Sequence, residues 1–138
     1  MIIKNIILWN NMKHSTVLGK YPINELTIQK NDIAYTMVDQ ILDVLKAKID
    51  AHPVATYIAT FDHYTHTKSL AEGEINEAIL DAKNIIFCFG KQLPNASMMA
   101  LRPRSIGVLE YKDTFAVSFM DAPNPQAHEA MTAWVKSI

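Results

Sequence analysis

The 138-residue sequence has few of the residues that characterise several large classes of protein. Its single cysteine, Cys88, cannot form an internal disulfide, which is typical of proteins that fold in a reducing compartment. Only four glycines are present and they are scattered, so the sequence contains neither a phosphate-binding loop nor a Rossmann turn. It also lacks the Gly-x-Ser-x-Gly elbow that carries the nucleophile of an α/β-hydrolase.

The sequence also lacks an excess of either charge and any long apolar run. Thirteen Lys and Arg residues face fourteen Asp and Glu residues, and the net charge of −1 gives no reason to expect nucleic acid or an anionic membrane as a partner. No apolar run approaches the roughly 20 residues that cross a bilayer. The apolar start is interrupted by Lys4 and Asn5, and no small-residue cleavage site follows it. We therefore expect a cytoplasmic protein.

The remaining composition is typical of one globular domain. Hydrophobic residues make up 49% and charged residues 20% of a chain long enough to bury a core without disulfides or metal. The sequence at Met12 reads like a second start, and regular patterning begins only at Tyr21. We expect residues 1–20 to form an N-terminal extension and residues 21–138 to form a single domain.

Apolar spacing predicts the elements of this domain. Alternating or continuous apolar residues predict strands over 21–29, 54–61, 84–89 and a hairpin over 105–120. Helices are predicted from Thr36, where Asp39 would complete the cap, from Ser69 to Ala82, where Ser69 and Glu72 form a capping box, and after Asn124. The resulting order β-α-β-α-β-β-β-α predicts an α+β fold, a mixed sheet with helices packed on it.

A polar cluster follows the second predicted strand. It runs from Asp62 to Lys68 and includes His63 and His66, at the kind of strand end where sites commonly lie. Asp62 and His63 are candidates for acid–base catalysis, and His66 and Lys68 are candidate ligand-binding residues. The His-x-x-His pair could also chelate a metal, but a structural zinc site needs about four ligands, so we assign no metal site. The alternative is an ordinary polar loop with a histidine that bonds to the backbone.

Arg102 and Arg104 form a second candidate site. They are the only arginines in a chain with eleven lysines, and Pro103 stiffens the backbone between them. Guanidinium groups bind carboxylate or phosphate with two parallel donors, which an ammonium group cannot copy. We expect one of these arginines to contact a carboxylate or a bound anion. A structural ion pair, within the chain or across a dimer, is the alternative interpretation.

Two apolar features receive a structural interpretation. Cys88 lies in the short apolar run from Ile85 to Phe89, which predicts a central strand covered on both faces, so we expect a buried and unreactive thiol. A Cys88–His63 nucleophilic pair is the alternative. Met98 and Met99 could line a ligand pocket, although such flexible side chains more often fill gaps in a core.

The second half of the chain resembles a known family. The passage from Asp62-His63 through Ile86-Phe87-Cys88-Phe89-Gly90, Met98-Met99, Arg102-Pro103 and the hairpin 105–120 is similar to the domain-of-unknown-function 302 family of small bacterial proteins. The resemblance covers roughly residues 36–138 and implies an α+β fold and a homodimer. It departs from the family at Lys91-Gln92, where Asn-Pro is more frequent. Because that family has no established activity, the resemblance implies no function.

Taken together, these features predict a homodimeric accessory or binding protein for a small anionic ligand. Its pocket would be framed by Asp62, His63, His66, Arg102 and Arg104. The apolar residues 2–9 support the dimer, because they match no stripe of the domain and would be exposed in a monomer. Two other functions stay open, a metal- or histidine-assisted acid–base enzyme that uses Asp62 and His63, and a protein-interaction module. No cofactor is identified.

Overall fold

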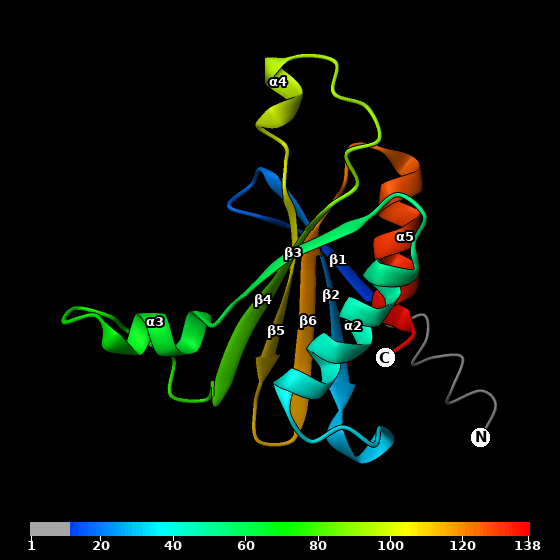
Figure 1. Cartoon of the computed structure of the whole chain (residues 1–138). Coiled ribbons are helices and arrows are strands. Elements are labelled where there is room, and N and C mark those ends of the chain that lie inside the picture. Colours follow the sequence, from blue (N-terminus) through cyan, green and yellow to red (C-terminus); the bar gives the residue numbers. More distant parts are fainter. Residues whose placement is uncertain (1–11) are drawn as a thin grey trace.

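Six strands form one antiparallel sheet in the order β1-β2-β6-β5-β4-β3 in the computed structural model, which describes residues 12–138 (Figure 1). The strands are β1 (Met12–Val17), β2 (Tyr21–Gln29), β3 (Thr56–Phe61), β4 (Asp81–Cys88), β5 (Arg104–Glu110) and β6 (Thr114–Met120). The helices are η1 (Lys30–Asp32), α2 (Val38–Ala51), α3 (His63–Ser69), α4 (Ala96–Met99) and α5 (Pro125–Lys136). The expected α+β class is confirmed, but the sheet is antiparallel throughout and not mixed, and the order of elements differs in detail.

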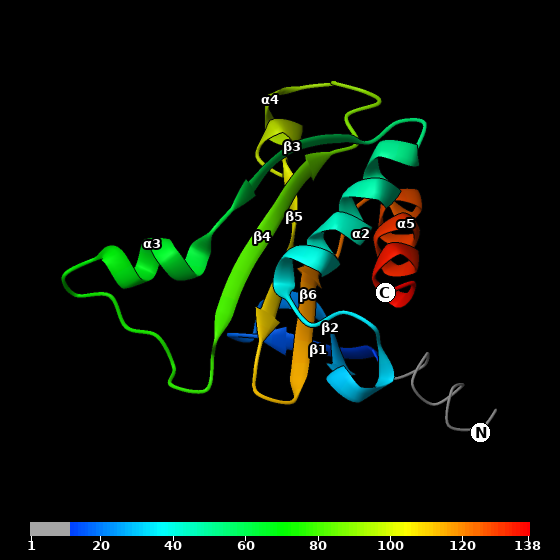
Figure 2. The ribbon, with the colours of Figure 1, turned by 60° about the horizontal axis from the view of Figure 1, so that its bottom comes forward.

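Helices α2 and α5 lie on one face of the sheet and form the core with it (Figures 1 and 2). Residues that face each other across the strands share this side, as Ile85 and Ile106 do, and both are fully buried. The alternating residues of β4, Ile86 and Cys88, point to the other face and are only half-buried. Strand β4 was expected to be covered on both faces, but only the face towards α2 and α5 is well buried.

The two long helices follow from local sequence. Helix α2 buries the predicted apolar stripe, in which Val38, Ile41 and Leu45 have no exposed surface. It begins at Val38 rather than Thr36, and Gln40, not Asp39, accepts hydrogen bonds from the backbone N–H groups that precede it. Helix α5 begins as expected, with the Asn124 side chain accepting two backbone N–H groups and Pro125 in the first turn.

The helix predicted from Ser69 to Ala82 is wrong. Asp62 instead caps the shorter helix α3, and Ser69 is its last residue. A Cβ atom on Gly73 would lie 2.0 Å from the carbonyl oxygen of Thr67, so the chain folds tightly against the end of α3 and leaves the helical path. Residues 70–80 then run without helix or strand to β4, which already begins at Asp81.

The chain before Tyr21 contributes to the sheet. Residues 12–20, which the sequence assigned to an extension, form β1 and a tight turn, and β1 pairs antiparallel with β2 along its whole length. The apolar residues 2–9 invoked for the dimer lie outside the described residues. Within residues 12–138, no helix has the length and apolar character required to cross a membrane.

Candidate functional site

A cleft of about 750 Å³ is lined by residues from the end of β4, the start of β5, the loop that carries α4 and the first turn of α5. We call it the Arg104 cleft. Figure 1 shows where these elements lie in the fold. The lining of the cleft combines three segments that are distant in sequence, 52–54, 88–104 and 122–127, and so it depends on the sheet topology. The lining residues are His52, Val54, Cys88, Phe89, Gly90, Lys91, Gln92, Pro94, Met98, Leu101, Arg102, Arg104, Ala122, Pro123, Asn124, Pro125, Gln126 and Ala127.

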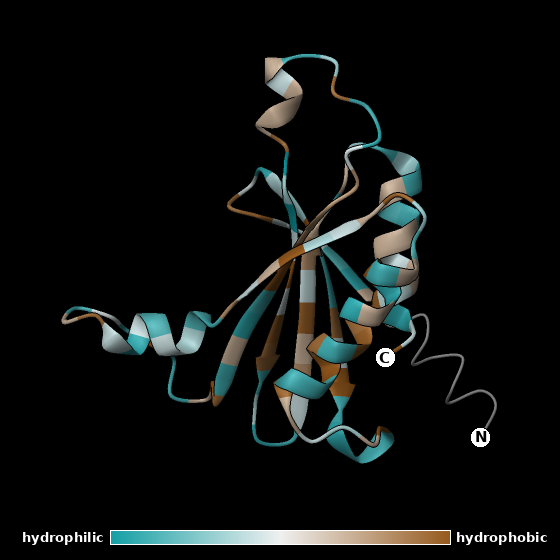
Figure 3. Ribbon diagram, in the orientation of Figure 1, coloured by the Kyte–Doolittle hydropathy of each residue, from teal (hydrophilic) through white to brown (hydrophobic). Residues whose placement is uncertain are grey.

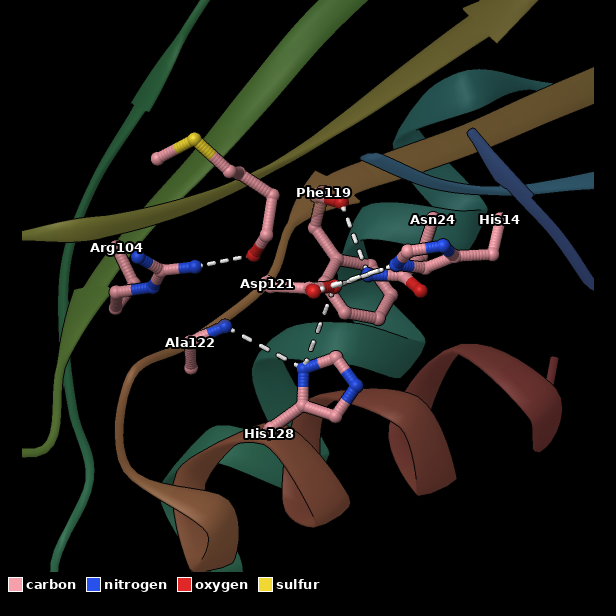
Figure 4. Close-up of polar contacts among 8 residues, drawn as sticks. His14, Asn24, Arg104, Phe119, Asp121, Ala122 and His128 are labelled. Carbon is pink, nitrogen blue, oxygen red and sulfur yellow. Dashed lines mark hydrogen bonds and ion pairs between the residues drawn. The ribbon is translucent and has the colours of Figure 1, made fainter. Parts of the chain in front are cut away.

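Arg104 is held on the core side of the sheet by its position in β5. It pairs with Phe87 of β4, which is fully buried, and only 9% of its own surface is exposed. Its Nη2 donates to the carbonyl oxygen of Met120 (Figure 4), while its Nε is enclosed without a hydrogen-bond acceptor. The buried position of Arg104 therefore comes from its strand, and its hydrogen-bonding capacity is only partly used.

No acidic side chain of residues 12–138 neutralises Arg104 at close range. The ion pairs found within residues 12–138 include neither Arg102 nor Arg104. Burial lowers the pKa of the Arg104 guanidinium from its ordinary value, and the more distant charge of Asp121 acts in the opposite direction. The expected contact with a carboxylate of the same chain is thus not formed by the described residues.

The lining of the Arg104 cleft carries charge of one sign. Among the residues that the structure describes, the cationic Lys91, Arg102 and Arg104 line it and no Asp or Glu does, although the chain has fourteen such residues. The first turn of α5 also lines the cleft, and the positive end of a helix dipole favours anions. An anion inside the cleft would therefore be attracted by these groups, and the nearest carboxylate, that of Asp121, lies beside the cleft and not in its lining.

His52 and aromatic rings form a firm part of the wall. The Nδ1 of His52 accepts the backbone N–H groups of Val54 and Ala55 at 3.1 and 3.2 Å, which leaves the proton of the neutral ring on Nε2. The ring of Phe89 stacks on Trp134 at 5.6 Å, and the ring of His52 meets the Phe89 ring edge-on at 5.4 Å. These contacts keep the wall in one arrangement and supply one further N–H donor.

A polar network lies beside Arg104 around the carboxylate of Asp121 (Figure 4). Asn24 donates to Asp121 at 2.7 Å, and His14 Nε2 lies 3.3 Å from both carboxylate oxygens. Partial burial opposes ionisation, but Asn24, His14 and His128 outweigh it and lower the pKa of Asp121. Neither His14 nor Asp121 lines the Arg104 cleft. The network instead connects β1, β2 and the end of β6 next to the cleft.

The cluster from Asp62 to Lys68 lies elsewhere. It forms helix α3, which projects from the sheet away from α4 and α5 (Figures 1 and 2), and none of its residues lines the Arg104 cleft. Phe61, just before it, pairs with Asn84 of β4, whereas Arg104 pairs with Phe87. The structure therefore brings Arg102 and Arg104 together and separates both from Asp62, His63, His66 and Lys68.

The side chains of α3 have local roles. Asp62 accepts the backbone N–H of Thr65 at 3.0 Å and its hydroxyl at 2.9 Å, and these bonds, with the nearby charge of Lys83, lower the pKa of Asp62 despite some desolvation. The rings of His63 and His66 lie beside Phe61, at 5.3 and 5.5 Å. Asp62 thus caps the helix instead of orienting His63. Lys83 connects this region to α2 through its bond to Asp39 at 2.6 Å.

Two further candidate chemistries can be placed. In residues 12–138, no group of three or more His, Cys, Asp or Glu side chains is arranged to hold a metal ion. Cys88 is half-buried in the wall of the Arg104 cleft, so it is less buried than its apolar neighbours predict. It pairs with Thr56 at the start of β3, and at about 3.3 Å per residue His63 lies more than about 15 Å away. The Cys88–His63 pair is therefore not formed.

Several lining residues could not be identified from the sequence. His52, Phe89 and the first turn of α5 belong to different elements, and each alone has an ordinary structural explanation. The signal that did point to the site was the pair of arginines in a chain that otherwise uses lysine. The Met98 side chain lines the cleft as well, whereas Met99 does not.

The comparison with known proteins supports the expectation of an uncharacterised family. No curated protein and no solved structure matches the sequence significantly. The likeness to the domain-of-unknown-function 302 family stays a prediction, because the family model that matches is a different one. The match spans residues 12–138, from the first residue of β1 to the end of the chain, and so the protein belongs to the family of unknown function DUF6858.

Proposed function

We propose that this protein binds a small organic anion in the Arg104 cleft. One observation carries the proposal: Arg104, in the wall of the cleft, has only 9% of its surface exposed, and no carboxylate of residues 12–138 forms an ion pair with its guanidinium. Buried charges in proteins are nearly always paired, because an unpaired charge in such a position is costly. A bound anion would supply the missing partner.

The cleft has the properties of a ligand site. Its volume of about 750 Å³ falls in the range of roughly 300–1,000 Å³ that is usual for small-molecule pockets. Apolar residues make up much of the lining, and a few polar groups, among them Arg104, Arg102 and His52, are placed around them. A cleft of this kind binds a ligand with both a charged and an apolar part. Unlike the pocket expected from the sequence, the Arg104 cleft does not include Asp62, His63 or His66, and the candidate Lys68 does not line it either.

An acid–base reaction at Asp62 and His63 is the weaker alternative. Both oxygens of Asp62 accept hydrogen bonds from Thr65, and the cleft residues lie at a different end of β3 and β4. A general base needs a substrate within hydrogen-bond reach, and α3 buries none of its residues. We therefore favour binding over catalysis at this cluster.

The proposal includes a homodimer. Exposed apolar side chains support it, because such surface is often covered by a partner. Polar residues are frequent on the outward sides of α2 and α5 (Figure 3), and apart from Met37 the exposed apolar residues lie on other parts of the fold. They lie on the β1–β2 turn, β3, the segments beside α3 and α4, and the end of β6. The residues are Val17, Leu18, Tyr21, Ile58, Phe61, Leu70, Leu80, Leu93, Met99, Leu101 and Met120.

Origin and location complete the proposal. A bacterial source and a relation to the domain-of-unknown-function 302 family are supported by the short motifs from Asp62 to Pro103. A cytoplasmic location is supported by the single cysteine, which cannot form an internal disulfide, and by the near balance of charges.

Thermal unfolding of the full chain with and without anions tests the binding function. The probes are hexanoate, benzoate, citrate and inorganic phosphate, each at the same ionic strength as a chloride control. At least one probe should raise the melting temperature, because a ligand that binds only the native state stabilises it. The rise should disappear in Arg104→Met and persist in Lys112→Met, whose exposed lysine lies in the β5–β6 turn at the other end of β5. No rise above chloride, or an equal rise in Arg104→Met, would contradict the proposal.

A further inference from the structure

We infer that the anion bound in the Arg104 cleft is a monocarboxylate with an extended apolar body, and not a phosphate. The carboxylate would contact Arg104, and the apolar body would lie on the wall formed by Phe89, Met98 and Leu101. This inference rests on the proposed function and names the chemical class of its ligand.

The donors of the cleft suit a carboxylate better than a phosphate. Phosphates at helix N-termini are held by free backbone N–H groups. At α5 these groups are not free, because Gln126 and Ala127 donate to the Asn124 side chain at 2.9 and 3.1 Å, and Pro125 has no N–H. What remains are side-chain donors, the guanidinium groups of Arg104 and Arg102 with Lys91 and His52 in the same lining, and guanidinium groups bind planar carboxylates well.

The state of Arg104 limits the charge that it can balance. Its Nη2 already donates to the carbonyl oxygen of Met120, and its Nε is buried without an acceptor. Among the described residues, Nη1 is therefore the nitrogen that is neither bonded nor fully buried. One terminal nitrogen, assisted by Arg102, can satisfy the single charge of a carboxylate. A phosphate monoester carries up to two charges and three acceptor oxygens, and so it would need more donors than the Arg104 guanidinium offers.

The remaining lining fits an apolar body. Phe89 is fixed by its stack on Trp134, Met98 is a flexible side chain that adapts to different shapes, and Leu101 is 43% exposed although it lines the cleft. A volume of about 750 Å³ is far more than a bare carboxylate group fills. An exposed leucine in the wall gains contacts only when apolar atoms cover it, which a chain or ring attached to the carboxylate would do.

Calorimetric titration of the full chain with acetate, hexanoate, decanoate, decanol and inorganic phosphate tests the class of ligand. The affinity should rise about fourfold for each added methylene from acetate towards decanoate, the increase expected from burial of apolar surface. Decanol should bind at least tenfold more weakly than decanoate, because it lacks the charge. Phosphate should bind no more tightly than acetate.

Two pairs of variants separate the charged and the apolar contact. Leu101→Ser should weaken decanoate binding about tenfold and leave acetate unchanged, whereas Leu93→Ser should alter neither, since Leu93 is 70% exposed in the same loop but does not line the cleft. Arg104→Met should bring decanoate down to the affinity of decanol, and Lys112→Met should not.

The outcomes distinguish this inference from the proposed function. If phosphate or acetate binds as tightly as decanoate and requires Arg104, the cleft is an anion site but the monocarboxylate class is wrong. If decanoate binds equally well to Arg104→Met, or if no probe binds, the proposed function fails and this inference fails with it. Binding of decanoate that responds to Leu93→Ser as strongly as to Leu101→Ser would also overturn the assigned position of the apolar body.

Discussion

Arg104 carries a charge that no acidic side chain of residues 12–138 neutralises through a close ion pair. Its position is imposed by the strand, because alternation along β5 directs residues 104, 106 and 108 to the core side. Burial at this side stabilises the apolar Ile106, whereas it removes water from the charged guanidinium of Arg104. The free protein therefore contains an unfavourable group, which is the usual condition of a residue retained for binding and not for stability.

Replacement of Arg104 separates charge from geometry. Arg104→Met loses the hydrogen bond to Met120 but also removes the desolvated charge and keeps an apolar side chain of similar length, and because these effects offset each other we expect the free energy of unfolding to stay within about 1 kcal/mol of the wild-type value. Arg104→Lys keeps a charge but loses the planar group that reaches the carbonyl oxygen of Met120, and we expect a loss of about 1–2 kcal/mol. Urea unfolding of the three proteins measures both changes. A loss of several kcal/mol in Arg104→Met would mean that the charge is well paired.

Cys88 reports on occupation of the cleft. It is the single thiol of the chain, and it lines the Arg104 cleft in a half-buried position, so every product of thiol labelling comes from this site. We expect alkylation by a maleimide to proceed slowly in the free protein and more slowly still with saturating decanoate, because the ligand covers the thiol. Mass spectrometry over time measures the rate. An equal rate with and without decanoate in a protein that binds it would place the ligand outside the cleft.

Helix α3 depends on one capping residue. Asp62 accepts both the backbone N–H and the hydroxyl of Thr65, and these bonds together with Lys83 hold its pKa below the ordinary value of 3.8. The carboxylate therefore stabilises the folded helix fully above the unfolded pKa, and this contribution is lost as the pH falls through the lower, folded pKa. We expect the Thr65 amide resonance to titrate below pH 3.8 and to lose this transition in Asp62→Asn. Titration at or above the ordinary value would contradict the cap.

Helices and strands could be predicted from the sequence where the interactions that form them are local. Helices α2 and α5 were predictable because their apolar stripes, and for α5 the Asn124 cap, lie within about fifteen residues, although the cap predicted for α2 at Thr36 and Asp39 was wrong. The helix predicted from Ser69 failed because two cap signals overlapped: Asp62 starts a helix seven residues earlier, and Gly73 lets the chain approach Thr67 closely at its end. Strand β1 was missed because it has few apolar residues and is stabilised by its pairing with β2.

The same reasoning applies to the candidate site. Arg102 and Arg104 were recognisable because guanidinium chemistry differs from that of the other cations in the chain. The sequence could not show that their expected partners on α3 lie far from them. The register of β3 on β4 and of β4 on β5 decides which strand ends meet, and it is not visible in the sequence. The actual companions of Arg104, such as His52 and Phe89, are brought there by the end of α2 and the end of β4.

The whole molecule has two sheet edges of unequal character. The edge strand β1 carries Lys13 and His14, which is the kind of charge that protects an edge from pairing with another strand. The opposite edge strand β3 has the sequence TYIATF, with no charge and no proline, and Ile58 and Phe61 are exposed on it. Helix α3 continues from this edge into solvent and buries no residue (Figures 1 and 2). An uncharged strand can pair with a second copy of itself without opposing like charges.

We therefore expect the protein to be a dimer in which β3 and the segment around α3 meet the same elements of a second copy. A twofold axis presents the same surface on both subunits, so one substitution acts twice. Ile58→Lys places two ammonium groups in the interface and should convert the dimer to a monomer, while Met37→Lys, at a methionine of similar exposure on the start of α2, should not. Light scattering measures the mass, with one chain at 15.6 kDa. A wild-type mass of one chain at every concentration would refute the dimer, and a dimer that withstands Ile58→Lys would place its interface on another of the exposed apolar regions.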